Sequence, residues 1–197
     1  MRKLVLKTAL IAFASTVGAM LLFCLACLLF FPSFTSDFCW DVGMQNASVN
    51  YAEKAYLKSG EDGDLVVLVE RAIVAENDNL VANYGELLIG GEYFENYSKT
   101  AQNEHYSGNY NGYIVGNVAV SFYKNGQKDK ALLCVKNHLN EYLPFNAARY
   151  LMSEVFTQND KEFASTLKAF LEELSLDGTQ VQLVESDISL LDKFIND

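Results

Sequence analysis

One uncharged apolar run near the N-terminus constrains this chain more than any other feature. No residue between Thr8 and Ser36 carries a charge, and "ALIAFASTVGAMLLFCLACLLFF", from Ala9 to Phe31, is almost wholly apolar. At about 1.5 Å per residue, a helix over this run would reach about 34 Å, and the hydrocarbon core of a bilayer is about 30 Å thick. The run therefore predicts a transmembrane helix over residues 8–31, through which the chain is held in the membrane.

A cleaved secretory signal is the competing interpretation of this run. Such signals have an apolar core of about 7–15 residues, followed by small residues at the cleavage site. Here the run is longer and ends in "LLFFPSF", without a small-x-small pattern. The stretches "LLFC" and "CLAC" also lack the small-residue tetrapeptide of a lipoprotein signal. We favour an uncleaved signal-anchor, and cleavage stays open as the alternative.

The flanking charges predict how the chain is oriented. Three cations precede the span and none follows before Lys54, whereas Asp37 and Asp41 come soon after it. By the positive-inside rule, residues 1–7 are expected in the cytoplasm and everything after Phe31 outside it. We therefore expect a single-pass membrane protein with an extracytoplasmic C-terminal domain.

The part after the span is strongly acidic. It holds 12 of the 15 Lys and Arg residues and all 25 Asp and Glu residues. Such a balance argues against nucleic acid as a partner and against a domain lying on an anionic bilayer.

Residues 32–45 are expected to form a connector. They mix Pro, Gly and Ser with three aromatic residues, Phe34, Phe38 and Trp40. These aromatic side chains are expected at the membrane interface, where amphipathic rings are common. Packing on the first helix of the domain is the alternative.

The four cysteines do not form a metal-binding pattern. Cys24 and Cys27 lie in the span and fit small apolar packing. Cys39 and Cys134 would share the outer compartment, where a disulfide is compatible with the sequence, although we expect buried free thiols. Small residues four apart in the span, Ala14 and Gly18, are compatible with self-association through the transmembrane helix.

The stretch "SFYKNGQKDKALLCV" predicts a helical hairpin. Apolar residues at helical spacing precede it and follow it, and an Asn-Gly pair separates the two stripes. Gly126 can adopt the left-handed conformation that ends a helix. Phe122 is expected to fill the inside of the hairpin, and Ala131 to be small because the two helices approach most closely there.

The same pattern recurs at a period of about 34 residues, which is typical of a helical solenoid. It predicts four hairpins, 46–78, 79–111, 112–145 and 146–176, with turns near Gly60, Gly90, Gly126 and Asp160. Asp64 and Asp160 are expected to be N-caps. An apolar stripe from Val181 to Ile195 predicts a C-terminal helix that caps the array.

Residues 112–145 resemble a tetratricopeptide repeat. The residues that fall at or within one position of that family's characteristic places are Ala119, Phe122, Gly126, Ala131 and Pro144. Residues 46–78 resemble it through Tyr56, Gly60 and Ala72, although the usual early Trp and Leu-Gly pair are missing. The resemblance covers about residues 46–179 as a degenerate array. It implies an all-α right-handed α-solenoid of about four helix-turn-helix repeats over domain 46–197, which binds proteins or peptides without catalytic residues.

No catalytic or cofactor motif stands out. The chain has two histidines, His105 and His138, and lacks a phosphate-binding loop, a nucleophile elbow and a metalloprotease motif. We therefore expect no enzyme activity, no cofactor and no metal. Two alternatives stay open: a membrane-bound hydrolase using either histidine with a carboxylate such as Glu104, and a structural spacer acting through its transmembrane helix.

The predicted function is that of a membrane-anchored scaffold that binds a protein or peptide at the external face, within an envelope-associated assembly. In the family that the chain resembles, the first helix of each hairpin lines the concave side of the array. Ligand contacts are therefore expected from Tyr84, Tyr113, Asn117 and Tyr150, and electrostatic steering from Lys124 and Arg149. Alternatively, Tyr113 and Tyr150 belong to the core.

Two further surfaces are candidates for binding. The second and third hairpins are rich in tyrosine, which suits recognition surfaces but also fills gaps in an irregular repeat; these residues are Tyr93, Tyr97, Tyr106, Tyr110 and Tyr113. A mildly basic patch could receive an acidic peptide and comprises Lys124, Lys128, Lys130, Lys136 and Arg149.

Overall fold

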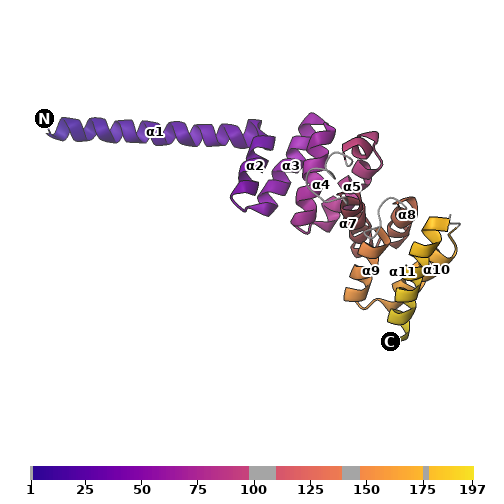
Figure 1. Ribbon diagram of the computed structural model, residues 1–197. Helices are drawn as coiled ribbons and strands as arrows, with labels where there is room; N and C mark the ends of the chain where they lie inside the picture. The colour runs from indigo at the N-terminus through magenta and orange to yellow at the C-terminus, as the bar shows by residue number, and fades with distance from the viewer. Residues whose placement is uncertain (1, 98–109, 139–146, 175–177) are drawn as a thin grey trace. The chain divides into compact units, whose positions relative to one another are not determined.

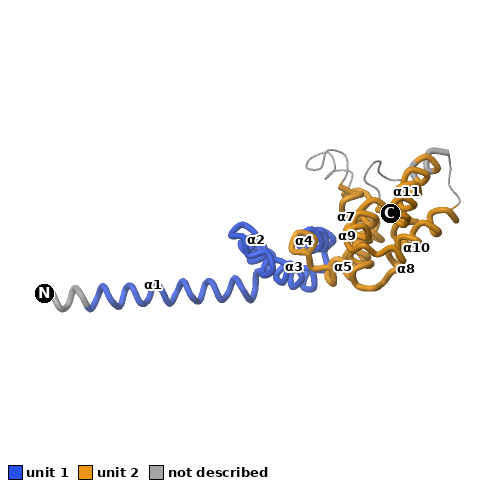
Figure 2. The backbone as a smooth tube through the Cα atoms, turned by 90° about the horizontal axis from the view of Figure 1, so that it is seen from below, with its two compact units in different colours: residues 1–71 blue, residues 72–197 orange. Residues whose placement is uncertain are grey.

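The computed structural model describes residues 2–97, 110–138, 147–174 and 178–197, and the secondary structure of these residues is helical without strands (Figure 1). The expected all-α class is therefore confirmed. The chain divides into two compact units, residues 1–71 and 72–197 (Figure 2). This division falls within helix α4 (Asp62–Val74), whereas the sequence suggested a domain beginning at residue 46.

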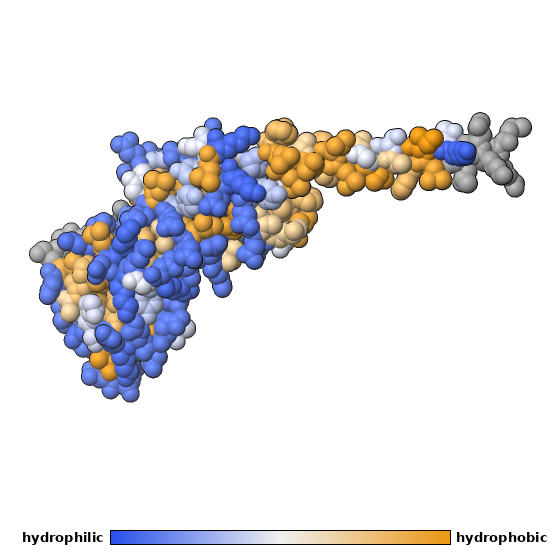
Figure 3. All heavy atoms as spheres, turned by 180° about the vertical axis from the view of Figure 1, so that it is seen from behind, coloured by the Kyte–Doolittle hydropathy of each residue, from blue (hydrophilic) through white to orange (hydrophobic). Residues whose placement is uncertain are grey.

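Helix α1 (Arg2–Phe30) is the apolar helix that the sequence predicts. Its segment Lys7–Phe30 has a mean hydropathy of 2.3 and is long and apolar enough to cross a membrane. Large apolar side chains such as Phe13, Leu22 and Phe23 are about two-thirds exposed along it. The apolar surface is visible along α1 in Figure 3.

Most of the segment expected to form a connector is helical, because residues 32–41 form a helix, α2 (Pro32–Asp41). Phe31 alone separates it from α1. Pro32 begins the helix, where the fixed φ of proline is favourable and its missing N–H costs nothing. The Thr35 hydroxyl donates to the carbonyl oxygens of Cys27 and Phe31, both at 3.0 Å, which ties the new helix to the end of α1.

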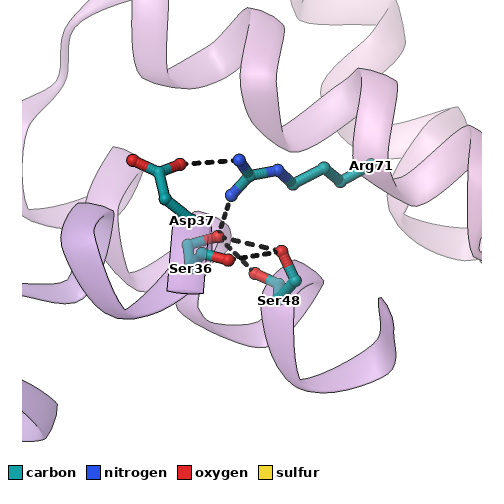
Figure 4. Close-up of polar contacts among 4 residues, drawn as sticks. All are labelled: Ser36, Asp37, Ser48 and Arg71. Carbon is teal, nitrogen blue, oxygen red and sulfur yellow. Dashed lines mark hydrogen bonds and ion pairs between the residues drawn. The ribbon is translucent and has the colours of Figure 1, made fainter. Parts of the chain in front are cut away.

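Helices α2 and α3 (Gln45–Ser59) pack side by side in the first unit. At their contact two buried serines bond reciprocally: Ser36 Oγ donates to the Ser48 carbonyl at 2.6 Å, and Ser48 Oγ donates to the Ser36 carbonyl at 2.8 Å (Figure 4). Arg71 of α4 donates to Ser36 Oγ and, at 2.6 Å, to the Asp37 carboxylate. Small side chains and these paired polar groups let the helices approach closely.

The hairpin turn at Gly60 is confirmed, since this residue caps α3 with a φ of 67°. The expected N-cap at Asp64 is wrong. Helix α4 begins two residues earlier, at Asp62, so Asp64 lies in its first turn and accepts a hydrogen bond from Ser59 Oγ at 2.5 Å. Acidic residues in a first turn stabilise the positive end of the helix dipole, which suits both Asp62 and Asp64.

The second unit is built around α7 (Tyr110–Lys124). This helix packs against α5 (Asp78–Ile89), α8 (Lys128–His138) and α9 (Ala147–Thr157). Residues 92–97 are also helical. Helix α10 (Lys161–Glu172) packs against α9 and α11 (Gly178–Asn196). The expected C-terminal helix is thus present, with Val184 and Leu191 buried.

The hairpin formed by α7 and α8 follows the sequence prediction closely. Gly126 has a φ of 73° at the turn, and the Phe122 and Ala131 side chains are buried inside. At the next turn Asp160 is the N-cap of α10 and accepts a hydrogen bond from the Phe163 N–H at 2.9 Å. Both the turn and the capping prediction hold there.

Candidate functional site

The candidate site is a groove in the second unit with a volume of about 500 Å³. Three successive first helices of the expected hairpins, α5, α7 and α9, line it together with the end of α4 and the turn after it. Its lining comprises Ile73, Val74, Glu76, Asp78, Val81, Tyr113, Asn117, Val120, Ser121, Lys124, Tyr150, Ser153 and Glu154. Polar and aromatic side chains therefore dominate the side of the groove formed by α7 and α9.

Hydrogen bonds to Asp78 fix the wall of the groove between α5 and α7. The Ser121 hydroxyl donates to Asp78 Oδ1 at 3.0 Å, and the Asn125 side chain donates to the Asp78 carbonyl oxygen at 3.0 Å. Asn77 caps α5 by accepting from the Leu80 N–H, which sets Asp78 in the first turn of the helix. Asp78 is thereby held at the groove by the Asn77 cap, by Ser121 of α7 and by Asn125, which directly follows α7.

Lys124 lies between two carboxylates. Its Nζ atom is 3.7 Å from Asp78 Oδ2 and 3.8 Å from Glu154 Oε1. All three side chains are half-buried, so water screens these attractions only partly. With Glu76 also in the lining, the groove carries more acidic than basic groups. Its charge therefore favours a cationic or neutral ligand over an acidic one.

The polar centre of the groove lies on α7 and α9. Asn117 donates from Nδ2 to the Tyr113 carbonyl at 2.7 Å, one helical turn earlier, which orients its amide. Tyr150 lies on α9, and its protonated hydroxyl can donate a hydrogen bond; burial raises the pKa of this phenol further above neutrality. Neither Tyr113 nor Tyr150 is fully buried, and both line the groove.

Four of the six predicted site residues therefore meet in one place: Tyr113, Asn117, Lys124 and Tyr150. Tyr84 and Arg149 do not line the groove. Arg149 donates from Nε to Oδ1 of Asp187, a fully buried carboxylate of α11, at 3.0 Å. This contact gives Arg149 a structural position between α9 and α11, away from the place at which steering was expected.

The groove also contains acidic residues that the sequence prediction missed. Asp78 and Glu154 became site residues only through contacts with α7, at residues thirty or more positions away in the chain. One available indication was helical spacing, since Glu154 follows Tyr150 by one turn and shares its face. No comparable local pattern marked Asp78.

The expected basic patch is largely neutralised by ion pairs. Lys128 Nζ lies 3.1 Å from Asp160, and Lys130 Nζ lies 2.6 Å from Glu86. Lys124 is bracketed by carboxylates, as described above. Acidic groups therefore surround the cations that were expected to receive an acidic peptide.

The tyrosine-rich segment forms an aromatic cluster in its described part. Tyr110 is fully buried, and its ring centroid lies 6.3 Å from that of Phe94 and 5.7 Å from that of Tyr97. The Tyr93 and Tyr97 rings stack at 5.8 Å. Tyr110 thus has a packing role, while Tyr106 and His105 lie outside the described residues.

Within the described part of the chain, no group of three or more His, Cys, Asp and Glu side chains could hold a metal ion. All four cysteines are free thiols, with Cys39 and Cys134 buried. Burial, with a smaller contribution from Glu86, raises the pKa of the Cys134 thiol to about 12. A thiol in that state is a poor nucleophile at neutral pH because it carries no charge.

Compared with known proteins, the chain matches no protein-family model, no curated protein and no solved structure. What the groove binds must therefore be inferred from its own geometry and charge.

Proposed function

We propose that this protein is a membrane-anchored scaffold whose second unit binds an extended protein or peptide segment in the groove of α5, α7 and α9. The observation that carries this proposal is the meeting of Tyr113, Asn117 and Tyr150 in one groove of about 500 Å³. A groove of this size suits a few side chains of a partner. Tyrosine and asparagine supply contact area and hydrogen bonds to such a segment.

The order of helix contacts supports a solenoid of tetratricopeptide-like repeats. Helix α7 packs against α5 before it and α9 after it, which are the first helices of the neighbouring hairpins, and also against α8, its own hairpin partner. Helix α11 packs against α10 and α9, where a cap is needed. In such an array the first helices line the concave side, and the groove is lined mainly by α5, α7 and α9.

The charge of the groove indicates the chemistry of its ligand. Glu76, Asp78 and Glu154 outnumber Lys124, and the half-buried position of Glu154 makes its negative charge available to a partner at short range. Ser153 and Asn117 add hydrogen-bonding groups. We therefore propose a segment that carries a Lys or Arg side chain, in place of the acidic peptide expected from the basic patch.

Helix α1 supplies the membrane anchor in this proposal. Its apolar segment Lys7–Phe30 has the length of a span, and the cations of the chain's first seven residues favour a cytoplasmic N-terminus. The groove would then face the external side. Protease added to intact cells should remove the second unit, and complete protection would reverse this orientation.

The direct test is photo-crosslinking in native membranes, with the crosslinker placed at Ser153, on the exposed side of α9 in the groove lining. Asn117→Ala and Glu154→Gln should each reduce capture of the partner without lowering the melting temperature appreciably. Asn137→Ala on α8 is a matched control, because this exposed residue lies outside the groove. Equal capture by all three variants would show that the groove does not bind the partner.

Two further variants separate the other functional classes. A double His105→Ala, His138→Ala variant should keep full function if the protein is a scaffold, and should lose it if either histidine serves a hydrolase. A chain that retains α1 but lacks residues 46–197 should lose function. Retained function would indicate a spacer that acts only through its anchor.

A further inference from the structure

Helix α2 has its polar and apolar faces reversed relative to an ordinary surface helix. Its buried residues are small or polar: Pro32, Thr35, Ser36 and Cys39. The Phe34 and Phe38 side chains, by contrast, are 59 % and 58 % exposed. A helix in water normally turns its large apolar side chains toward the core, because removing their surface from water is favourable.

The buried polar face is fully accommodated and does not result from poor packing. Ser36 and Ser48 exchange hydrogen bonds with each other's carbonyl groups, so neither hydroxyl is buried without a partner (Figure 4). Thr35 bonds back to α1. The contact with α3 therefore needs small side chains at these positions, and the phenylalanines necessarily face outward.

The outward face continues the apolar surface of α1. Phe30 and Phe31 at the end of that helix are 63 % and 59 % exposed, and Phe34 and Phe38 follow at helical spacing. Only Phe31 lies between the two helices. Figure 3 shows apolar surface running along α1 and onto the adjoining part of the first unit.

A cationic side chain contacts the C-terminal end of α1, where this apolar face begins. Lys58, near the end of α3, donates from Nζ to the Phe30 carbonyl oxygen at 2.9 Å. This bond satisfies one of the carbonyl groups that a helix leaves unpaired at its C-terminus. Lysine side chains commonly extend to the headgroup level at the end of a span, and aromatic residues gather at the same depth.

We infer that α2 is an interfacial helix, with Phe31 and Phe34 inserted at the boundary between lipid headgroups and acyl chains. Phe38 lies at a shallower depth. Asp41, seven residues after Phe34 and therefore on the same side, reaches the aqueous edge, so the helix is inclined out of the membrane. This inference rests on the proposed anchoring by α1.

The bilayer, and not a partner protein, is the occupant of this face. The stripe begins at the last turn of an apolar helix and ends at Asp41, about three turns later, so its extent matches a shallow insertion. The other acidic residue of the helix, Asp37, is turned toward Arg71 and pairs with it at 2.6 Å. The rest of the first unit thus follows α1 without a flexible linker and holds a fixed inclination to the membrane.

The test moves the single tryptophan of the chain to the exposed face of α2 and measures its fluorescence there. In the full-length protein, Trp40→Phe removes the native fluorophore, and Phe34→Trp or Phe38→Trp introduces one on the exposed face. Leu133→Trp, at a similarly exposed apolar residue of α8, is the matched control. Each variant is reconstituted in phosphatidylcholine vesicles whose acyl chains carry bromine close to the headgroup, and resistance to alkaline extraction reports insertion of α1.

Quenching by the brominated lipid should be several-fold stronger for tryptophan at position 34 than at position 133, with position 38 between them. Aqueous iodide should quench in the reverse order. Equal quenching at positions 34 and 133 in protein that resists extraction would overturn the interfacial helix and leave the anchor intact. Protein that is extracted at alkaline pH would overturn the anchor itself, and the interfacial helix with it.

Discussion

The ring of Tyr150 on α9 lies directly against the backbone of Gly116 on α7. A β-carbon at position 116 would overlap with the Cγ and Cδ2 atoms of that ring. The two helices therefore reach their observed packing only because this position has no side chain. Since Tyr150 lines the groove, the same contact determines part of the groove's shape.

Gly116→Ala is expected to destabilise the second unit by about 1–3 kcal/mol, because the added methyl group overpacks a close contact. It should also displace Tyr150 and so reduce partner capture. Chemical denaturation measures the first effect, and crosslinking in membranes measures the second.

Tyr150→Ala provides the control for this contact. In the Tyr150→Ala background, Gly116→Ala should lower the free energy of unfolding much less, because the ring that the added methyl group displaces is absent. Strictly additive effects of the two substitutions would show that Gly116 and Tyr150 are not coupled.

The charge of the groove can be tested through Lys124. Its Nζ atom lies within 4 Å of the Asp78 and Glu154 carboxylates, so Lys124→Gln releases two negative charges toward the ligand. Capture of a partner that carries Lys or Arg should therefore increase, and should become more sensitive to salt. An acidic partner would bind this variant more weakly, which would contradict the proposed ligand class. Lys136→Gln, on the exposed side of α8, is the matched control.

Local patterns were sufficient to predict the turns that follow α3, α7 and α9. Gly60 and Gly126 have positive φ values at their turns, and Asp160 caps its helix, because each feature depends on a few neighbouring residues. Helix α2 was missed because its buried face is polar. The sequence left open whether Phe34 and Phe38 lie at the membrane interface or pack on the first helix of the domain, and in the structure both are exposed.

The candidate site was predicted only in part, for a related reason. Tyr113 and Asn117 were predicted to contact a ligand because they lie on the first helix of an expected hairpin, and both line the groove. The positions of the charged groups depend on tertiary pairs. Arg149 was assigned to the groove, yet its partner Asp187 is a buried residue far along the chain that draws it to α11. Sequence spacing contains no information about such a pair.

Asp160 should make stability depend on pH. Its pKa in the folded protein is lowered, chiefly by the hydrogen bond from the Phe163 N–H and further by Lys128 and Tyr123. An unfolded Asp has a pKa of about 3.9, so the stabilisation is present above that pH and is lost as pH falls through the lower folded value. The effect is therefore confined to acidic solution.

Asp160→Asn separates charge from capping, since asparagine is also a good N-cap. Its stability deficit relative to the native protein should be largest at neutral pH and should vanish in strong acid. Asp160→Ala should retain a deficit of about 1 kcal/mol in acid, from the lost cap. Urea denaturation at several pH values measures both, and a deficit of Asp160→Asn that is independent of pH would contradict the assignment.

Deprotonation of the buried Cys134 thiol should destabilise the protein in alkaline solution. Burial raises the pKa of this thiol to about 12, so the neutral form is favoured in the folded state. The resulting stability is complete below the unfolded pKa, about 8.5, and is lost as pH rises from there toward the folded value. Cys134→Ala should therefore show a weaker decline in stability above that pH than the native chain.

Mass spectrometry after iodoacetamide treatment should find Cys134 unmodified in folded protein, modified in urea, and not disulfide-bonded to Cys39. Rapid labelling of the folded protein would mean that the thiol is neither buried nor protonated.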